Sequence, residues 1–535
     1  YVKYLEEYCN RFDLWKCIRF QCQVISVSDA SVDGTKEDDV AGYTVTYRDY
    51  RNSENNDAQE SATAEGGVLC TEHYDLVAVC SGLHNTPFIP TIPNIDSFQG
   101  TILHSSSYKD ASIFSHKRVL VLGSGETAMD IAHRAVSNPS TKSVALNVRN
   151  GFLSIPHNIT ADRPLDVFIT NLFEHAYEHP WVHALRLRWT LSTIVIRLFL
   201  FLAGSSLGFN QWSCAVDTVK RGYHIINKSH AAMSHLNVPI KKRSVMMGRF
   251  WMWMYGETYL KPIHSFHKTT IDSIDTKNGT TVQFDNGTTF DADMIIMATG
   301  YKQSFPFLSD AIKQEHRDEY NKNSCGGGGG GNLNNKRHEL DEDFLPSEHF
   351  IINKRRPRLA FIGFVRPNVG AIPPMSELQV MWWLCNLRGQ VKRLSSAPTG
   401  QNASYMVLGR KYPYGVDYGN YMHRVAEDID AAPTLRSLLR SSKRNKHPWR
   451  ALYTYCQGQA HIPLFRLRGP FASKMCWDVT TNELWDVCVR RGAAENFGLL
   501  SVTIVSFWMN LAACLLECVW CLCCGRRPSF FTRYG

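Results

Sequence analysis

Residues 117–136, with the sequence KRVLVLGSGETAMDIAHRAV, constrain the fold more than any other stretch of the chain. A short apolar run typical of a buried strand leads into Gly123. Ala128, Ile131 and Ala135 then follow at the spacing of one helix face. After a turn, the run SVALNVR alternates like a second strand. The order strand, helix, strand predicts a βαβ unit with a right-handed crossover, and therefore an α/β fold built on a parallel sheet.

The loop inside this unit fits the pattern G-x-G-x-x-A, which is typical of dinucleotide binding. The first glycine allows a tight turn, the second lets a pyrophosphate approach the backbone, and the small last residue keeps the helix close to the strand. The helix N-terminus adds N–H groups and the positive end of the helix dipole. The residues expected at this site are Gly123, Ser124, Gly125, Glu126, Thr127 and Ala128.

The end of the second strand indicates which dinucleotide is bound. A site for NAD usually has Asp or Glu here, on the ribose hydroxyl, whereas this strand ends with Arg149. A guanidinium is suited to a 2′-phosphate, so the sequence favours NADP. The alternative is a solvated arginine at a strand end.

Two further strand ends carry small residues where a backbone can come close to a ligand. Thr299 and Gly300 follow the apolar run MIIM, and Ser81 and Gly82 follow the run VAVC. Either pair could be an ordinary strand-to-loop turn. Together they indicate two nucleotide-binding sheets.

Composition narrows the class of protein. A chain of 535 residues is too long for one ordinary core, so we expect more than one domain. The net charge of +9 fits a solvated surface, an anionic cofactor or an anionic membrane face. The basic residues form no stripe with interleaved aromatics, so we do not expect a nucleic-acid partner. The sixteen cysteines are scattered and indicate reduced thiols rather than a disulfide framework.

The C-terminal part is apolar. Residues 497–516 hold no charge over about 20 positions, enough to enter or cross a bilayer, although a buried helix would have the same composition. Beyond it stand Cys518, Cys521, Cys523 and Cys524. We expect no metal there, because no second cluster or histidine partner follows. Reversible lipidation beside a membrane suits these thiols better.

A spaced set of residues precedes the glycine loop. Phe98, Gly100, His104 and Tyr108 match the pattern F-x-G-x-x-x-H-x-x-x-[YF] within a polar segment that we expect to be a linker. This pattern is typical of class B flavoprotein monooxygenases, and the chain resembles a flavin-containing monooxygenase of the dimethylaniline type. The resemblance extends over residues 1–20, 261–274, 294–308, 361–383 and 463–471 and includes the apolar C-terminal part, and it is loose over residues 150–250.

The resemblance implies two Rossmann-like dinucleotide-binding domains, with the NADP domain inserted into a discontinuous FAD domain. The first strand–loop–helix of the FAD domain, with its own G-x-G-x-x-G and an active-site Asn, is expected to be missing, because the chain starts too late and looks N-terminally truncated. The expected parts are 1–114 (partial FAD domain), 115–300 (NADP domain with a helical insertion at about 150–250), 301–490 (rest of the FAD domain, with a flexible glycine-rich loop at 320–345) and 497–524 (membrane segment).

The resemblance also implies the chemistry. NADPH reduces FAD, the reduced flavin captures O2 as a C4a-hydroperoxide, and one oxygen atom passes to a soft nitrogen or sulfur of an amine or sulfide. The cofactor supplies the reactivity, so no catalytic residue is assigned. Thr299 and Gly300 would lie near the cofactors, Gln379 on the flavin side, and His104 would set the linker. The family's Asn-Ser-Gly in the second loop is replaced by residues 126–128, so a carboxylate stands where an amide could touch the cofactor.

Two alternatives to an amine or sulfide oxygenase stay open. A Baeyer–Villiger enzyme would share both cofactors and attack ketones. A non-catalytic NADP-binding protein would follow from a genuine truncation. We expect a membrane-associated protein at the endoplasmic reticulum with its catalytic part facing the cytosol, and the oligomeric state is left open.

Overall fold

The fold is described from a computed structural model. The chain divides into two compact units. Unit 1 comprises Tyr1–Cys80 and Gln303–Ile362, and unit 2 comprises Ser81–Lys302 and Gly363–Gly535. The structure describes residues 2–30, 42–51, 67–149, 261–267, 269–324, 343–367, 370–392, 414–440 and 446–525, with Tyr405 and short pieces between 153 and 236.

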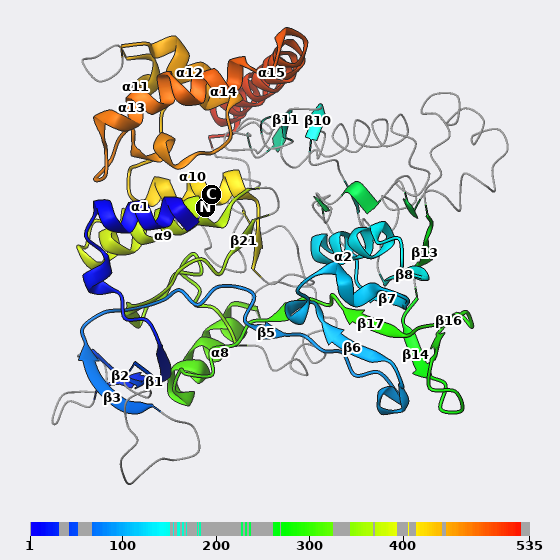
Figure 1. The fold of residues 1–535 in the computed structure, drawn as a ribbon. Coiled ribbons are helices and arrows are strands. Elements are labelled where there is room, and N and C mark those ends of the chain that lie inside the picture. The colour runs from blue at the N-terminus through cyan, green and yellow to red at the C-terminus, as the bar shows by residue number, and fades with distance from the viewer. Residues whose placement is uncertain are drawn as a thin grey trace. The chain divides into compact units, whose positions relative to one another are not determined.

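Unit 1 combines two small sheets with two helices (Figure 1). One sheet is an antiparallel meander in the order β1-β2-β3, and the other is mixed, in the order β19-β20-β4, with β20 and β4 parallel. The elements are α1 (Val2–Arg11), the 3₁₀ turn η1 (Trp15–Cys17), β1 (Cys22–Asp29), β2 (Tyr43–Asp49), β3 (Val68–Tyr74), β4 (Val77–Val79), α8 (Asp310–Ser324), β19 (Ile352–Asn353) and β20 (Arg356–Phe361).

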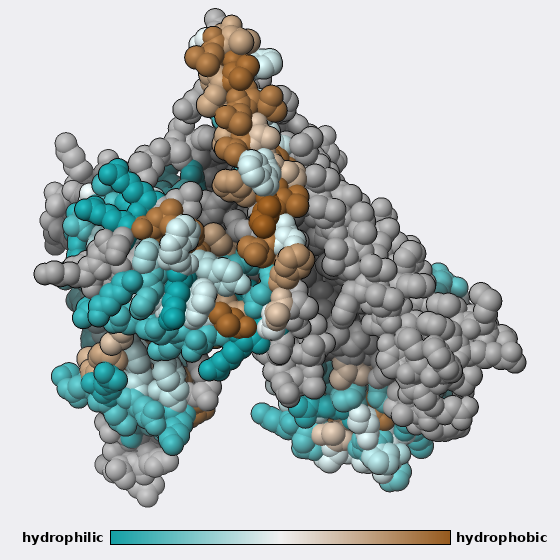
Figure 2. All heavy atoms as spheres, turned by 90° about the horizontal axis from the view of Figure 1, so that it is seen from above, coloured by the Kyte–Doolittle hydropathy of each residue, from teal (hydrophilic) through white to brown (hydrophobic). Residues whose placement is uncertain are grey.

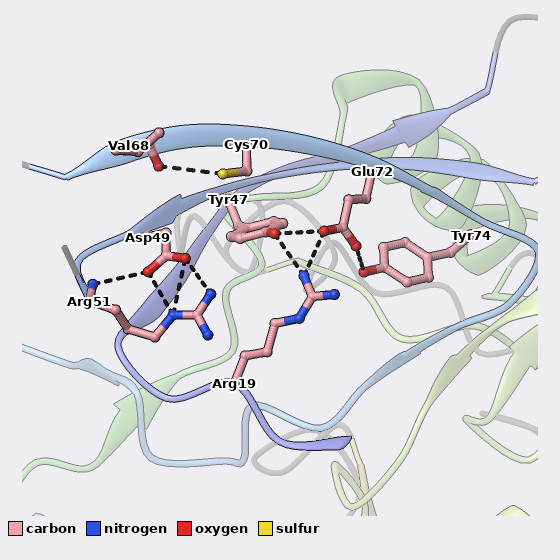
Figure 3. Close-up of polar contacts among 8 residues, drawn as sticks. All are labelled: Arg19, Tyr47, Asp49, Arg51, Val68, Cys70, Glu72 and Tyr74. Atoms are coloured by element: carbon pink, nitrogen blue, oxygen red, sulfur yellow. Dashed lines mark hydrogen bonds and ion pairs between the residues drawn. The ribbon is translucent and has the colours of Figure 1, made fainter. Parts of the chain in front are cut away.

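Polar side chains link the segment before β1 to the meander (Figure 3). Arg19 Nη1 donates to Tyr47 Oη at 2.7 Å and to Glu72 Oε1 at 2.6 Å. Tyr47 and Tyr74 also donate to the Glu72 carboxylate. These hydrogen bonds hold the pKa of Glu72 at about 2, below its usual range. This hydrogen-bonded set of Arg19, Tyr47, Glu72 and Tyr74 orders this face of the sheet. It adds little to the stability of the fold, because the charged side chains are exposed to solvent.

Unit 2 is built on a five-stranded parallel sheet in the order β13-β8-β7-β17-β6 (Figure 1). All four neighbouring pairs of strands are parallel. The strands are β6 (Thr101–His104), β7 (Arg118–Leu122), β8 (Ser143–Val148), β13 (Ile263–His267) and β17 (Met294–Met297).

The side chains of this sheet alternate between two buried layers. Val119, Val121 and Leu146 face α2 (Glu126–Ser137), whose buried residues complete one core. Leu120 and Ile295 face the other way. They pack against a small antiparallel sheet of β14 (Ile271–Ile274), β15 (Thr281–Phe284) and β16 (Thr289–Asp291). The sheet is therefore covered on both faces, as a parallel sheet requires.

The rest of unit 2 is mainly helical. In α9, residues Met375, Leu378 and Trp382 are buried, and this helix contacts α10. The elements are η2 (Ile95–Ser97), η3 (Ser105–Ser107), η4 (Ala111–Phe114), β5 (Thr86–Pro87), β9 (Leu153–Ser154), β10 (Asn158–Thr160), β11 (Arg163–Pro164), β12 (Ile226–Asn227), η6 (His230–Ala232), β18 (Tyr301–Lys302), β21 (Arg366–Pro367), α9 (Ile372–Leu387), β22 (Gly415–Val416), α10 (Tyr418–Asp428), α11 (Leu435–Leu439), α12 (Pro448–Gln457), η9 (Ile462–Arg466), α13 (Lys474–Thr481), α14 (Glu483–Val489) and α15 (Ala493–Cys524).

The α/β class and the Rossmann-like sheet expected from the sequence are confirmed, with β7, α2 and β8 as the βαβ unit. The segment expected to be only a linker contains β6, which pairs with β17 at the edge of the sheet. The expectation of a plain linker was therefore wrong. The four residues TILH are too few to show an alternating hydrophobic pattern, and at the edge of the sheet the first two of them are exposed.

The predicted domain boundaries stay predictions. α8 continues to Ser324, into the range expected to be a glycine-rich loop, and residues 325–342 lie outside the described residues. Most of residues 150–250, expected to be helical, also lie outside them. The described pieces there include the short strands β9 to β12.

Candidate dinucleotide-binding site

Gly123 occupies the turn that follows β7. Its φ of +124° lies where side-chain-bearing residues are strained, and a Cβ there would stand 2.3 Å from the carbonyl oxygen of Ala298. The Gly123 N–H donates to Asn147 O on the neighbouring strand at 3.0 Å. A glycine is therefore required at position 123, because the turn after β7 lies too close to the end of β17 for a side chain.

Gly125 has a different role. Its φ of −74° and ψ of 176° are open to any residue, and a Cβ there would meet nothing within 4 Å. Gly125 is also the N-cap residue of α2, so no N-cap side chain covers the first turn. Open space beside a backbone and at the N-terminus of a twelve-residue helix fits the approach of a pyrophosphate.

Of the remaining loop residues, one is buried in the core and the others are partly or fully exposed to solvent. Ala128 is fully buried, and its Cβ would be 3.7 Å from a Cβ at position 123, so a larger side chain would push α2 away from β7. Ser124 is half-buried in the loop, and Glu126 and Thr127 are exposed in the first turn of α2. The Glu126 carboxylate stabilises the positive end of the helix dipole and would repel a phosphate there.

Arg149 lies one residue beyond the end of β8 and is exposed. Because β7 and β8 are adjacent and parallel, their carboxyl ends lie at the same edge of the sheet. Leu122 pairs with Asn147, which places Arg149 and the glycine loop at this edge. Its contact with a 2′-phosphate stays a prediction.

The turn after β17 is tied to two distant segments. Gly300 O accepts from the Phe88 N–H at 2.9 Å and from His104 Nε2 at 3.0 Å. Thr299 Oγ1 donates to Phe88 O. Tyr301 then pairs with Pro87, joining β18 to β5. Thr299 and Gly300 are therefore held in place at the carboxyl edge of the parallel sheet.

The hydrogen bonds of His104 define its tautomer. Nδ1 accepts from the Ser106 N–H at 3.1 Å, so the proton of the neutral ring stands on Nε2 and is donated to Gly300 O. The ring also packs edge-on against Tyr301, with centroids 5.2 Å apart. His104 therefore positions the turn after β17.

The other three residues of the spaced set fix the same segment to the sheet. Phe98 is buried in the core beneath β7 and β17. A Cβ at Gly100 would stand 2.4 Å from Asp293 O, where the chain passes close to the start of β17. Tyr108 stacks on Phe114 at 5.5 Å between ring centroids. The set thus holds β6 in place.

Ser81 and Gly82 stand at the start of unit 2, before β5. Asn85 Nδ2 donates to Ser81 O at 2.6 Å, and Gly82 has a φ of +83° with open space where a Cβ would lie. The nearby ring of His84 lies 4.9 Å from that of Tyr301. Burial, and secondarily the charge of Arg366, lower the pKa of His84 below its usual range.

Gln379 lies in the middle of α9 and is fully buried. Its Oε1 accepts from the Gly363 N–H at 2.9 Å, and its Nε2 donates to Tyr421 Oη at 2.8 Å. Both ends of the amide are thus engaged within the protein. Gln379 holds the Gly363 turn, and a role on the flavin side would be indirect.

Sequence reasoning missed residues that complete this edge of the sheet. The Phe88 N–H donates to Gly300 O, and the ring of His84 packs against Tyr301. The only sequence signal for these two residues is a Pro-containing segment that follows Ser81 and Gly82. Asn147 was counted as part of an apolar strand, yet its buried amide donates to Thr269 O at 3.0 Å. Among the residues that the structure describes, no three His, Cys, Asp or Glu side chains gather as metal ligands.

The sheet and the glycine loop define a dinucleotide-binding α/β protein. Residues 1–187 match the family model described as flavin-binding monooxygenase-like. The chain is 30% identical to Monooxygenase ptmN of Penicillium ochrochloron over 546 residues, covering 94% of this chain and 79% of that protein. It is 26% identical to Flavin-containing monooxygenase 1 of Canis lupus familiaris over 484 residues, covering 88% of this chain and 74% of that protein.

The chain therefore belongs to the flavin-binding monooxygenase family. Membership implies that it uses FAD and NADP(H). Among solved structures, it is similar to a cyclohexanone-bound cyclohexanone monooxygenase, with 13% identity, 79% of this chain and 81% of that chain covered, and a TM-score of 0.45.

Proposed function

We propose that this protein is an NADPH- and FAD-dependent monooxygenase that transfers one oxygen atom of O2 to a soft nitrogen or sulfur nucleophile. The observation that carries the proposal is the pairing of open backbone at Gly125 with Arg149 at the same edge of the sheet. The first suits a pyrophosphate and the second a 2′-phosphate.

The residues of this chain bind and orient the nicotinamide cofactor. Gly125 and the first turn of α2 hold the pyrophosphate, and Arg149 selects the phosphorylated ribose. The turn at Thr299 and Gly300, fixed by His104, borders the site and limits where the nicotinamide can lie. When bound, the flavin supplies the oxygen-activating chemistry.

The preference for nitrogen and sulfur rests on the resemblance to flavin-containing monooxygenases of the dimethylaniline type. Flavin-containing monooxygenase 1 of the dog, with 26% identity, is similar over 88% of this chain. The resemblance in residues 294–308, around Thr299 and Gly300, points to the same branch of the family.

Substrate-stimulated oxidation of NADPH tests the proposal. The whole chain, saturated with FAD, should consume NADPH faster when a tertiary amine or a dialkyl sulfide is added, with formation of the N-oxide or S-oxide. Stimulation by a cyclic ketone alone, with lactone as product, would assign the protein to the Baeyer–Villiger type. Failure to take up flavin, judged by its visible absorption, would contradict any catalytic role.

The same proposal includes membrane association through α15. Among the described residues, one helical stretch, Asn496–Cys524, is long and apolar enough to cross a membrane, and 6% of its most apolar window is buried. Figure 2 shows a hydrophobic ridge along this helix. Large exposed side chains include Phe497, Phe507, Trp508 and Leu522. A lipid surface, at the endoplasmic reticulum with the catalytic part in the cytosol, would cover them.

A further inference from the structure

The last turns of α15 carry a cluster of thiols that the proposed oxygenase chemistry does not use. They contrast with the buried Cys385, Cys476 and Cys488, whose pKa values are raised by burial. Cys521 is half-buried, and the other thiols of the cluster are exposed. The cluster consists of Cys518, Cys521, Cys523 and Cys524.

These thiols are interleaved with exposed apolar side chains of the helix. Leu515 and Leu516 are 59% and 60% exposed, and Leu522 is 85% exposed. Val519 and Trp520 complete the same turns. A surface that buries these side chains in lipid brings the neighbouring sulfur atoms to the same depth, at the boundary between acyl chains and headgroups.

One face of α15 stays with the rest of unit 2. The His179 N–H donates to Asn510 Oδ1 at 2.5 Å, and His179 Nε2 lies 3.0 Å from Glu517 Oε2. Ala513, between them on the helix, is buried. These contacts hold the polar side chains of Asn510 and Glu517 against unit 2, as expected for a helix that lies in the plane of a membrane. A helix held in this way would place the thiols on the same side of the membrane as the folded part of the chain.

We propose that Cys518, Cys521, Cys523 and Cys524 are S-acylation sites. In the reaction, a cysteine sulfur attacks the carbonyl carbon of a long-chain fatty acyl-CoA. A new carbon–sulfur bond forms to the protein, the bond to the CoA sulfur breaks, and CoA leaves as a thiol with the proton. Nothing is oxidised or reduced.

Acylation would give the helix a second membrane signal. A single acyl chain gives only reversible membrane binding, so stable anchoring takes two signals. Arg526, Arg527 and Arg533 follow the cluster in the sequence and suit the anionic headgroups of a cytosolic leaflet. The inference rests on the membrane association proposed above and is independent of the oxygenase chemistry.

The test is metabolic labelling of the whole chain in eukaryotic cells with an alkyne-tagged palmitate. The membrane fraction should contain labelled protein whose label is released by neutral hydroxylamine, as thioesters require. Changing all four residues to serine (C518S, C521S, C523S, C524S) should abolish the label, and the matching alanine set should do the same. The control Cys17→Ser, at an exposed thiol far from α15 in sequence, should keep it.

Label that survives the fourfold change, or membrane-bound wild-type protein without label, would overturn the inference. NADPH oxidation by the same preparations separates the two proposals. Unlabelled protein that still oxidises an amine or sulfide rejects S-acylation alone, whereas labelled protein without this activity rejects the oxygenase alone.

Discussion

Arg149 and Lys142 are exposed cations at opposite ends of β8, and only Arg149 lies at the edge that holds the glycine loop. We expect Arg149→Ala to weaken the binding of NADPH by about 10- to 100-fold, since a hydrogen bond to a charged group contributes about 1.5–3 kcal/mol. NADH binding should change little, because NADH lacks the 2′-phosphate. Titration of both cofactors into the two proteins measures the difference.

Lys142→Ala is the matched control and should bind both cofactors as wild type does. An equal loss of NADPH and NADH affinity in Arg149→Ala would remove the phosphate role. The residue would then be a solvated arginine at a strand end.

The two glycines of the loop allow a sharper separation of folding from binding. Gly125→Ala should leave the thermal midpoint close to that of wild type, because its φ and surroundings accept a methyl group. It should still weaken NADPH binding by roughly tenfold or more, since the methyl group keeps the pyrophosphate from the backbone. Gly123→Ala should lower the midpoint, because its Cβ would meet Ala298 O at 2.3 Å.

Differential scanning fluorimetry with and without NADPH measures both effects. If Gly125→Ala binds NADPH as wild type does, the cofactor does not approach the backbone at this loop. If Gly123→Ala is as stable as wild type, the close packing of β7 against the turn after β17 does not hold in solution.

At the scale of elements, α10 contains a buried histidine that links stability to pH. His423 Nδ1 donates to Gly419 O at 2.8 Å, and Nε2 lies 2.9 Å from Tyr455 Oη. Burial lowers its pKa from 6.5 to about 4. Between pH 6.5 and pH 4, His423 is therefore protonated in the unfolded chain but neutral in the folded protein. The free energy of unfolding falls as the pH drops through this range, by up to about 3 kcal/mol from this group.

Urea unfolding followed between pH 7 and pH 4.5 tests this linkage. His423→Gln should be less stable at pH 7 but should lose less of its stability on acidification than wild type. His73→Gln, at an exposed position of β3, is the control and should retain the wild-type pH dependence. Parallel curves for wild type and His423→Gln would contradict the assignment, and His316, whose pKa is also lowered to about 4 by burial, would then be the next residue to change.

The elements around the glycine loop could be predicted because their signals are local. β7, α2 and β8 each show a strand or helix period within a short window, and Gly123 marks the turn between them. The pairing of β6 with β17 could not be predicted, because Met297 pairs with His104 across nearly two hundred residues and β6 has only four. Likewise, no local pattern signals that both ends of the Gln379 amide are satisfied inside the protein.

For the whole molecule, the family resemblance implied a discontinuous FAD domain, and that division stays a prediction. Unit 1 is discontinuous with other boundaries, and its second part, Gln303–Ile362, supplies β20 beside β4. The point at which the chain returns to unit 2 had no signal. Gly363 belongs with α9 through its hydrogen bond to Gln379, although the apolar run before it belongs to β20. A boundary inside one continuous apolar stretch depends on tertiary packing.

The association of the whole chain with membranes should depend on α15. Deletion of residues 497–535 removes the exposed apolar side chains but keeps the contact of Tyr453 Oη with Asn496 Oδ1 at 3.0 Å, so the remaining helices should stay packed. We expect the shortened protein to move from the membrane pellet to the supernatant after cell fractionation, with NADPH binding unchanged. Replacement of Trp508 and Trp520 by serine should weaken membrane binding in part, because aromatic side chains favour the interface. If the shortened protein stays in the pellet, the apolar residues 184–208 become the membrane-binding segment, and α15 would instead be covered by another protein surface.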